Sequence, residues 1–89
     1  MEKHNWQSIE NFKLSEYTPG TFINVRVEYA KKNDWDIHLG WVVGAGFTCS
    51  NRQKGKLDVI NGIYLPYLHA NIKKYKITHF CIVPELKLD

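Results

Sequence analysis

The sequence contains few cysteines and no long hydrophobic run. Two cysteines, Cys49 and Cys81, occur among 89 residues, which is too few for the disulfide framework of a small secreted domain. No stretch approaches the roughly 20 apolar residues that a transmembrane helix needs. The polar N-terminus is not followed by the apolar core of a secretory signal. These absences argue against a disulfide scaffold and a helical membrane protein, and they predict a cytoplasmic protein with reduced cysteines.

The length predicts a single domain spanning residues 1–89. Such a small domain has a thin margin of stability, and the three Trp, five Tyr and four Phe residues supply much of the apolar area available for a core. The net charge of +3 is modest, but its distribution is uneven. Six basic residues and one acidic residue, Asp58, lie between positions 52 and 76: the basic ones are Arg52, Lys54, Lys56, Lys73, Lys74 and Lys76. This region either attracts anions or is simply a solvated lysine-rich surface.

Alternating apolar residues predict an antiparallel hairpin in the first half of the chain. One alternating run covers residues 21–30, and a second covers residues 35–43. The polar segment 31–34 between them predicts the turn. In the second run one face carries Trp35, Ile37, Leu39, Trp41 and Val43. Because the two tryptophans are in phase with these aliphatic residues, we expect both to belong to the core.

Two further strand regions are expected in the second half. Asn61-Gly62 lies between apolar runs and predicts a hairpin with a type I′ turn. Pro66 cannot donate a ladder hydrogen bond, so its strand is expected to be an edge strand or to end there. The last strand is predicted over residues 75–83, with Ile77, His79 and Cys81 sharing one face, and with bulky groups on both faces it should be central.

These patterns predict a mainly β fold. We expect a small, twisted antiparallel sheet of four or five strands, barrel-like, with at most a short helical turn near the N-terminus. Exposed sheet edges and the many aromatic residues also favour a homo-oligomer.

Catalytic and metal sites are weakly indicated. A Cys–His nucleophile pair could be drawn from either cysteine with His38, His69 or His79, but no oxyanion loop accompanies it. The set His38, His79, Cys49 and Cys81 lacks the spacing of a zinc site. The pair Gly44 and Gly46 predicts a bulge rather than a dinucleotide fingerprint. We therefore predict no enzymatic activity, no metal and no cofactor.

The combination of tyrosines and basic residues is the best candidate for a site. Aromatic rings stack on nucleobases, and lysine and arginine attract phosphates. The predicted ligand-binding set is Arg52, Lys54, Lys56, Tyr64, Tyr67, Lys73, Lys74 and Tyr75. Arg26 and His38, on the polar faces of neighbouring strands, could form a second polar site.

The segment Ile77–Leu86, with the sequence ITHFCIVPEL, resembles the C-terminal signature of a small phage and prophage family, domain of unknown function 551. Thr78 and His79 match that signature, while Phe80-Cys81 replaces its Trp-Met. Trp6, Pro19-Gly20 and Gly40-Trp41 are similar to further marks of the family. The resemblance implies a phage or mobile-element setting, in which small proteins often block host defences.

Together these observations predict a non-enzymatic accessory protein of phage type. It would counter a host defence by binding and sequestering an anionic, nucleotide-like small molecule. Two alternatives remain open: a module that inhibits a host effector protein such as a nuclease, and a weak nucleic-acid-binding protein whose affinity falls with salt.

Overall fold

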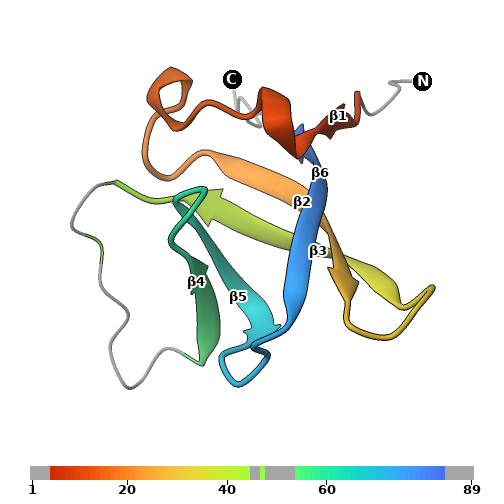
Figure 1. Ribbon diagram of the computed structural model, residues 1–89. Coiled ribbons are helices and arrows are strands. Elements are labelled where there is room, and N and C mark those ends of the chain that lie inside the picture. Colours follow the sequence, from red (N-terminus) through yellow and green to blue (C-terminus); the bar gives the residue numbers. More distant parts are fainter. Residues whose placement is uncertain (1–4, 45–46, 48–53, 84–89) are drawn as a thin grey trace, which may run out of the picture.

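The computed structural model describes residues 5–44, 47 and 54–83, which form one open antiparallel sheet (Figure 1). Within these residues the strands are β1 (Gln7–Ser8), β2 (Phe22–Tyr29), β3 (Trp35–Val42), β4 (Gly55–Asp58), β5 (Ile63–His69) and β6 (Tyr75–Ile82). Their order across the sheet is β1-β6-β2-β3-β5-β4. The prediction of a mainly β, antiparallel fold is confirmed.

The helical content of the described residues is confined to two single turns of 3-10 helix. They are η1 (Ile9–Asn11) and η2 (Leu14–Glu16), and both precede β2. The Ser8 side chain caps η1 by accepting a hydrogen bond from the Glu10 backbone N–H. Among the described residues, no helix has the length and apolar character needed to cross a lipid bilayer.

The β2–β3 hairpin is present as predicted. The alternation in β2 buries Ile23, Val25 and Val27 completely, because these side chains point to the concave face of the sheet, which we call the inner face. The turn that joins the strands contains Asn33 in the left-handed region, with φ of 65°. Asparagine tolerates this conformation better than most residues.

The side chains of β3 that turn toward the core are the opposite set from the predicted one. Val25 pairs directly with His38, so the inner face of β3 carries His38 and Gly40. Trp35 and Ile37 therefore point to the outer face, where they are 49% and 48% exposed. The expectation that Trp35 belongs to the core is wrong, and Trp41 is only half-buried. Register against β2 decides the facing, and periodicity alone cannot reveal which of two alternating sets turns inward.

A β-bulge changes the facing of residues along β6. Arg26 pairs with His79 while the next residue, Val27, pairs with Ile77, so Thr78 is the extra residue. The Thr78 hydroxyl donates a hydrogen bond to the carbonyl of Arg26 at 3.4 Å. Ile77 consequently joins the buried inner face instead of sharing a face with His79, which corrects the predicted alternation. β6 is second in the strand order and not at the centre of the sheet: it pairs with β2 along its length, and on its other side only Phe80 and His79 pair with the two-residue strand β1. The expectation of a central strand is therefore only partly met.

The core lies on the inner face, where side chains of β5 pack with those of β2 and β6. Its buried members are Ile23, Val25, Val27, Ile63, Leu65, Leu68, Ile77 and Phe80. The segment that precedes β2 closes one end of this core. In it, the Phe12 ring packs edge to face with the Phe80 ring, with 5.2 Å between the ring centroids. Gly40 allows β3 and β5 to approach closely, since a Cβ there would overlap the carbonyl oxygen of Tyr64.

The β4–β5 hairpin forms, but its turn is not the predicted type. Residues 59–62 make a four-residue connection between the closing pair Asp58 and Ile63. The Gly62 N–H donates to the Asp58 carbonyl at 2.8 Å, and the Asn61 N–H donates to the Asp58 carboxylate at 3.1 Å. Gly62 alone has a positive φ in this turn, of 70°, whereas a type I′ turn would require one at Asn61 as well.

Pro66 is accommodated inside β5 rather than ending it. The β4–β5 register shifts between Gly55 and Lys56, so that Gly55 pairs with His69 and Lys56 with Leu65. The shift removes Pro66 from the regular ladder, where its missing N–H would leave a carbonyl unsatisfied. The predicted bulge at Gly44–Gly46 falls partly outside the described residues.

Candidate functional site

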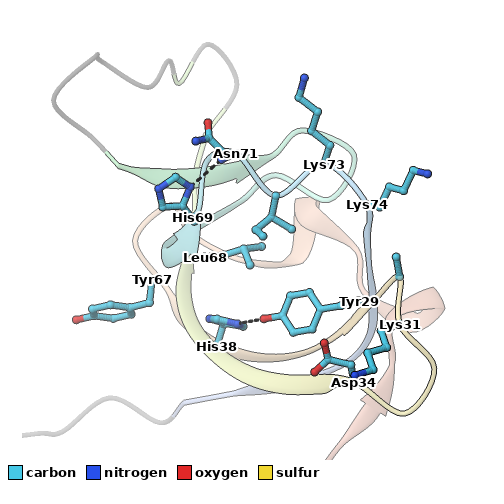
Figure 2. A pocket seen from close by; sticks show the side chains of 12 residues that line it. Tyr29, Lys31, Asp34, His38, Tyr67, Leu68, His69, Asn71, Lys73 and Lys74 are labelled. Carbon is cyan, nitrogen blue, oxygen red and sulfur yellow. Dashed lines mark hydrogen bonds between the residues drawn. The ribbon is translucent and has the colours of Figure 1, made fainter.

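A cavity of about 570 Å³ opens at one end of the sheet, between the β2–β3 turn and the β5–β6 connection. Figure 2 shows Tyr29 and His38 directed toward each other inside it, with Leu68 beside them and lysines at its border. The two connections that border it contain residues 30–34 and 70–74. They lie side by side because β2 and β6 are paired up to Tyr29 and Tyr75, at the base of each connection.

The inner part of the cavity is built around a tyrosine–histidine pair. The Tyr29 hydroxyl lies 2.6 Å from Nε2 of His38, and the two groups share a hydrogen bond. Burial, and then the nearby carboxylates of Asp36 and Asp34, raise the pKa of Tyr29 above its ordinary value. The hydroxyl therefore keeps its proton at neutral pH and acts as a hydrogen-bonding group rather than as a phenolate.

One wall of the cavity presents His69 in a defined tautomer. The backbone N–H of Asn71 donates to Nδ1 of His69 at 3.1 Å. Since Nδ1 accepts this bond, a neutral imidazole carries its proton on Nε2. His69 is exposed, so this N–H is available as a donor to an oxygen atom of a ligand.

The border of the cavity has a positive balance of charge. Lys31, Lys73 and Lys74 line it together with one carboxylate, that of Asp34, which leaves a formal excess of two positive charges. Figure 2 shows Lys73 and Lys74 extending outward from the β5–β6 connection. Flexible ammonium groups at the mouth of a hollow raise the local concentration of anions.

The structure brings three of the eight predicted ligand-binding residues to this cavity. Tyr67, Lys73 and Lys74 all line it; the ring of Tyr67 is 73% exposed and projects from the border, away from Tyr29 and His38 (Figure 2). Lys54 is exposed just before β4, where its carbonyl accepts a hydrogen bond from Ala70. Arg52 lies outside the described residues.

The remaining three predicted residues occupy other positions. Tyr64 is buried on the sheet, with ring centroids of Trp41 and Phe47 at 5.0 Å and 5.7 Å. Lys56 and Tyr75 form a separate cluster, in which Nζ of Lys56 lies 5.5 Å from the centre of the Tyr75 ring. The predicted set is therefore divided between a cavity, a packed aromatic cluster and a cation–π contact.

The cation–π cluster connects the open edge of the sheet to β6. The Tyr75 hydroxyl is hydrogen-bonded to the buried carboxylate of Asp58 on β4. Burial first, and then the charge and hydrogen bond of Asp58, raise the pKa of Tyr75 from 10.0 to about 12. This contact links β4 to a strand with which it has no ladder pairing among the described residues.

The raised pKa of Tyr75 predicts a loss of stability in alkali. The unfolded chain releases this proton near pH 10, whereas the folded protein retains it until about pH 12. The stabilisation is therefore complete below pH 10 and declines as the pH rises toward 12. We expect thermal melts from about pH 9.5 to about pH 11.5 to show a steeper fall in Tm for the wild type than for Tyr75→Phe. Tyr67→Phe, at an exposed tyrosine, should follow the wild type, and parallel curves for all three proteins would contradict the assignment.

Several lining residues were not in the predicted set. Tyr29 reads as one more apolar residue in an alternating strand, and Asn71 as part of a basic linker. The second polar site predicted from Arg26 and His38 does not form. The register places Arg26 opposite Ile37 on the outer face, whereas His38 lies on the inner face, so the two side chains point in opposite directions. The predicted hairpin did indicate that residues on either side of the 31–34 turn lie near each other, and this is the sequence feature that could have identified Tyr29 and His38.

The residues considered for catalysis or metal binding are dispersed. His79 lies on the outer face, where its Nδ1 is 3.0 Å from the Thr78 hydroxyl, while His38 lies on the inner face. Cys81 is buried, and Cys49 lies outside the described residues. In the part of the chain that the structure describes, no three His, Cys, Asp or Glu residues converge as metal ligands would.

Comparison of the chain with family models, with curated proteins and with solved structures found no match.

Proposed function

We propose that this protein binds a small anionic molecule of nucleotide type in the cavity beside Tyr29 and His38, and holds it without converting it. The observation that carries the proposal is the meeting of three lysines, an exposed tyrosine and two hydrogen-bonding histidines around one hollow. The cavity volume lies within the range of about 300–1,000 Å³ that is usual for small-molecule sites.

The chemistry of the lining matches the two parts of a nucleotide. The exposed ring of Tyr67 offers a face on which a base can stack, a contact worth about 1–3 kcal/mol in nucleic-acid-binding proteins. The ammonium groups of Lys31 and Lys73 approach from the two connections and can contact phosphate oxygens. The Nε2–H of His69 adds a directed donor to the same anion.

Binding without conversion agrees with the groups at the cavity. The described residues that line it include no Cys, Ser or Thr, and the Tyr29 hydroxyl remains protonated. In the phage-type setting that the resemblance implies, an unconverted ligand points to sequestration of a signalling nucleotide, which would lower its free concentration and counter a host defence.

Reversing charge across the cavity should weaken ligand binding. We expect the double variant Lys31→Glu/Lys73→Glu to reduce affinity at least about tenfold, because each substitution replaces attraction for phosphate with repulsion. The measurement is isothermal titration calorimetry against nucleoside diphosphates, cyclic dinucleotides and ADP-ribose. A ligand with a base and phosphate should bind, and the adenine-free compound ribose 5-phosphate should bind more weakly.

A matched variant controls for net charge. Lys13→Glu/Lys54→Glu changes the formal charge equally, but neither residue lines the cavity, so affinity should remain within about twofold of the wild type. Equal loss in both double variants would show nonspecific electrostatic attraction instead of a site. Absence of binding to every nucleotide, with salt-sensitive binding to a single-stranded oligonucleotide, would favour the nucleic-acid alternative.

A further inference from the structure

The outer face of the β2–β3 hairpin is an exposed apolar surface. Trp35, Ile37 and Leu39 follow one another on this face of β3 at alternate positions. We call the outer patch the set of exposed residues Trp6, Phe22, Trp35, Ile37 and Leu39. Phe22 lies on the same face of β2, beside the Trp41 end of this row, and Trp6 lines a groove together with Trp35 and Ile37.

The area of the outer patch suits a dimer interface. Its side chains are between 38% and 50% exposed, which corresponds to apolar area on the order of 500 Å². This equals the largest apolar patch of a typical monomer. Two such patches facing each other, with their neighbouring polar side chains, would bury roughly 1,200 Å² in total, the lower limit for a specific interface.

The charges beside the outer patch complement the same charges of a second copy. Arg26 and Glu28 lie on the outer face of β2 and form an ion pair of 3.2 Å, with both side chains partly exposed. The guanidinium of Arg26 also lies 4.6 Å from the centre of the Trp35 ring. Across a two-fold axis, Arg26 of one copy can approach Glu28 of the other, and the reverse contact follows by symmetry.

The same charges disfavour nucleic acid as the occupant. A surface that binds phosphates carries cations that are not already neutralised. Arg26 is paired with Glu28, and the lysine that borders this pair on the same face, Lys76 on β6, lies opposite Glu28 in the ladder. Tryptophan and arginine are enriched, and lysine depleted, at the centres of protein interfaces.

A shallow groove on this face offers a place for a side chain of the second copy. It has a volume of about 270 Å³ and is lined by Trp6, Arg26, Trp35, Ile37 and His79. Two tryptophans that flank a groove beside a paired arginine resemble the aromatic anchors that dominate binding energy at protein interfaces.

We infer that a second copy of this chain docks on the outer patch, so that two sheets pack face to face about a two-fold axis. Each cavity beside Tyr29 and His38 lies on the inner side of its own sheet and stays open in this dimer. Dimerisation and ligand binding are thus separable by mutation.

Sedimentation equilibrium of the full chain tests this inference. The wild type should have twice the monomer mass of 10.4 kDa at micromolar concentration. Ile37→Glu and, as an independent variant, Leu39→Glu should raise the dissociation constant at least about 100-fold, because each places a carboxylate in the apolar interface. Ile60→Glu is the matched control at an apolar residue that is 94% exposed and outside the patch, and it should remain dimeric. Circular dichroism verifies that all three variants fold.

A mixing experiment tests the facing of the two copies. Arg26→Glu and Glu28→Arg should each weaken self-association, since like charges then meet across the axis, and an equimolar mixture should form a heterodimer. A monomeric wild type at about 100 µM would overturn the inference, as would dimers that persist in both Ile37→Glu and Leu39→Glu. A monomer that retains nucleic acid through Trp35 would overturn it in favour of a nucleic-acid-binding surface.

Discussion

Replacing Phe80 with alanine is expected to lower the free energy of unfolding by about 3–5 kcal/mol. Phe80 is completely buried and lies opposite Val25 in the β6–β2 ladder. Its ring contacts Phe12 edge-on, with an interplanar angle of 78°, so truncation would leave a cavity and also release the segment that precedes β2. A domain of this length has a total stability of roughly 5–13 kcal/mol, and the loss is a large fraction of it.

Urea denaturation followed by circular dichroism measures this effect. Tyr67→Ala removes an aromatic ring of similar size from an exposed position, and its stability should stay within about 0.5 kcal/mol of the wild type. Equal midpoints for Phe80→Ala and the wild type would mean that the core is not centred on β6.

Replacing Gly40 with alanine is expected to destabilise the protein by about 2–3 kcal/mol. A Cβ at this position would overlap the carbonyl oxygen of Tyr64 and lie 2.8 Å from a methyl carbon of Leu65. The Tyr64 backbone cannot retreat cheaply, because Tyr64 pairs with Trp41 where β3 meets β5. Relief of the overlap requires the two strands to separate, which weakens the core contacts of Leu65 on the inner face.

Gly44→Ala provides the matched control for the glycine experiment. Among the residues that the structure describes, a Cβ at Gly44 would meet only the ring of Pro19, at an ordinary distance of 3.4 Å. Stability should be unchanged or increase slightly, because alanine restricts the unfolded chain. Similar thermal midpoints for the two alanine variants would contradict the close approach of β3 and β5.

The sequence was sufficient to predict the strands but not the side of the sheet to which each strand presents its apolar residues. Alternation in β2 and β3 located the hairpin, since a strand shows a period of two whichever strand it pairs with. Which set turns inward depends on register, and the pairing of Val25 with His38 turns Trp35 outward. The bulge at Thr78 was equally hidden, because one extra residue leaves no mark in composition.

The candidate site was predictable only in part. Lys73 and Lys74 were found from local charge, and Tyr67 from its proximity to them in sequence. Tyr29 and His38 come from a different hairpin, and only the pairing of β2 with β6, between segments about fifty residues apart, brings them to the same cavity. Tyr64 shows the converse error, because a tyrosine between apolar neighbours is as well suited to packing as to recognition.

Tyr29 and Tyr75 are the last pair of the β2–β6 ladder. The Tyr29 hydroxyl contacts His38 on β3, and the Tyr75 hydroxyl contacts Asp58 on β4. This one residue pair therefore connects β2, β6, β3 and β4 at the end of the sheet where residues 70–74 begin. Insertions or deletions within residues 70–74 fall beyond this tie, so they can reshape the mouth of the cavity while the sheet keeps its register. Under the proposed function, changes in that connection alone would alter which ligand the cavity accepts.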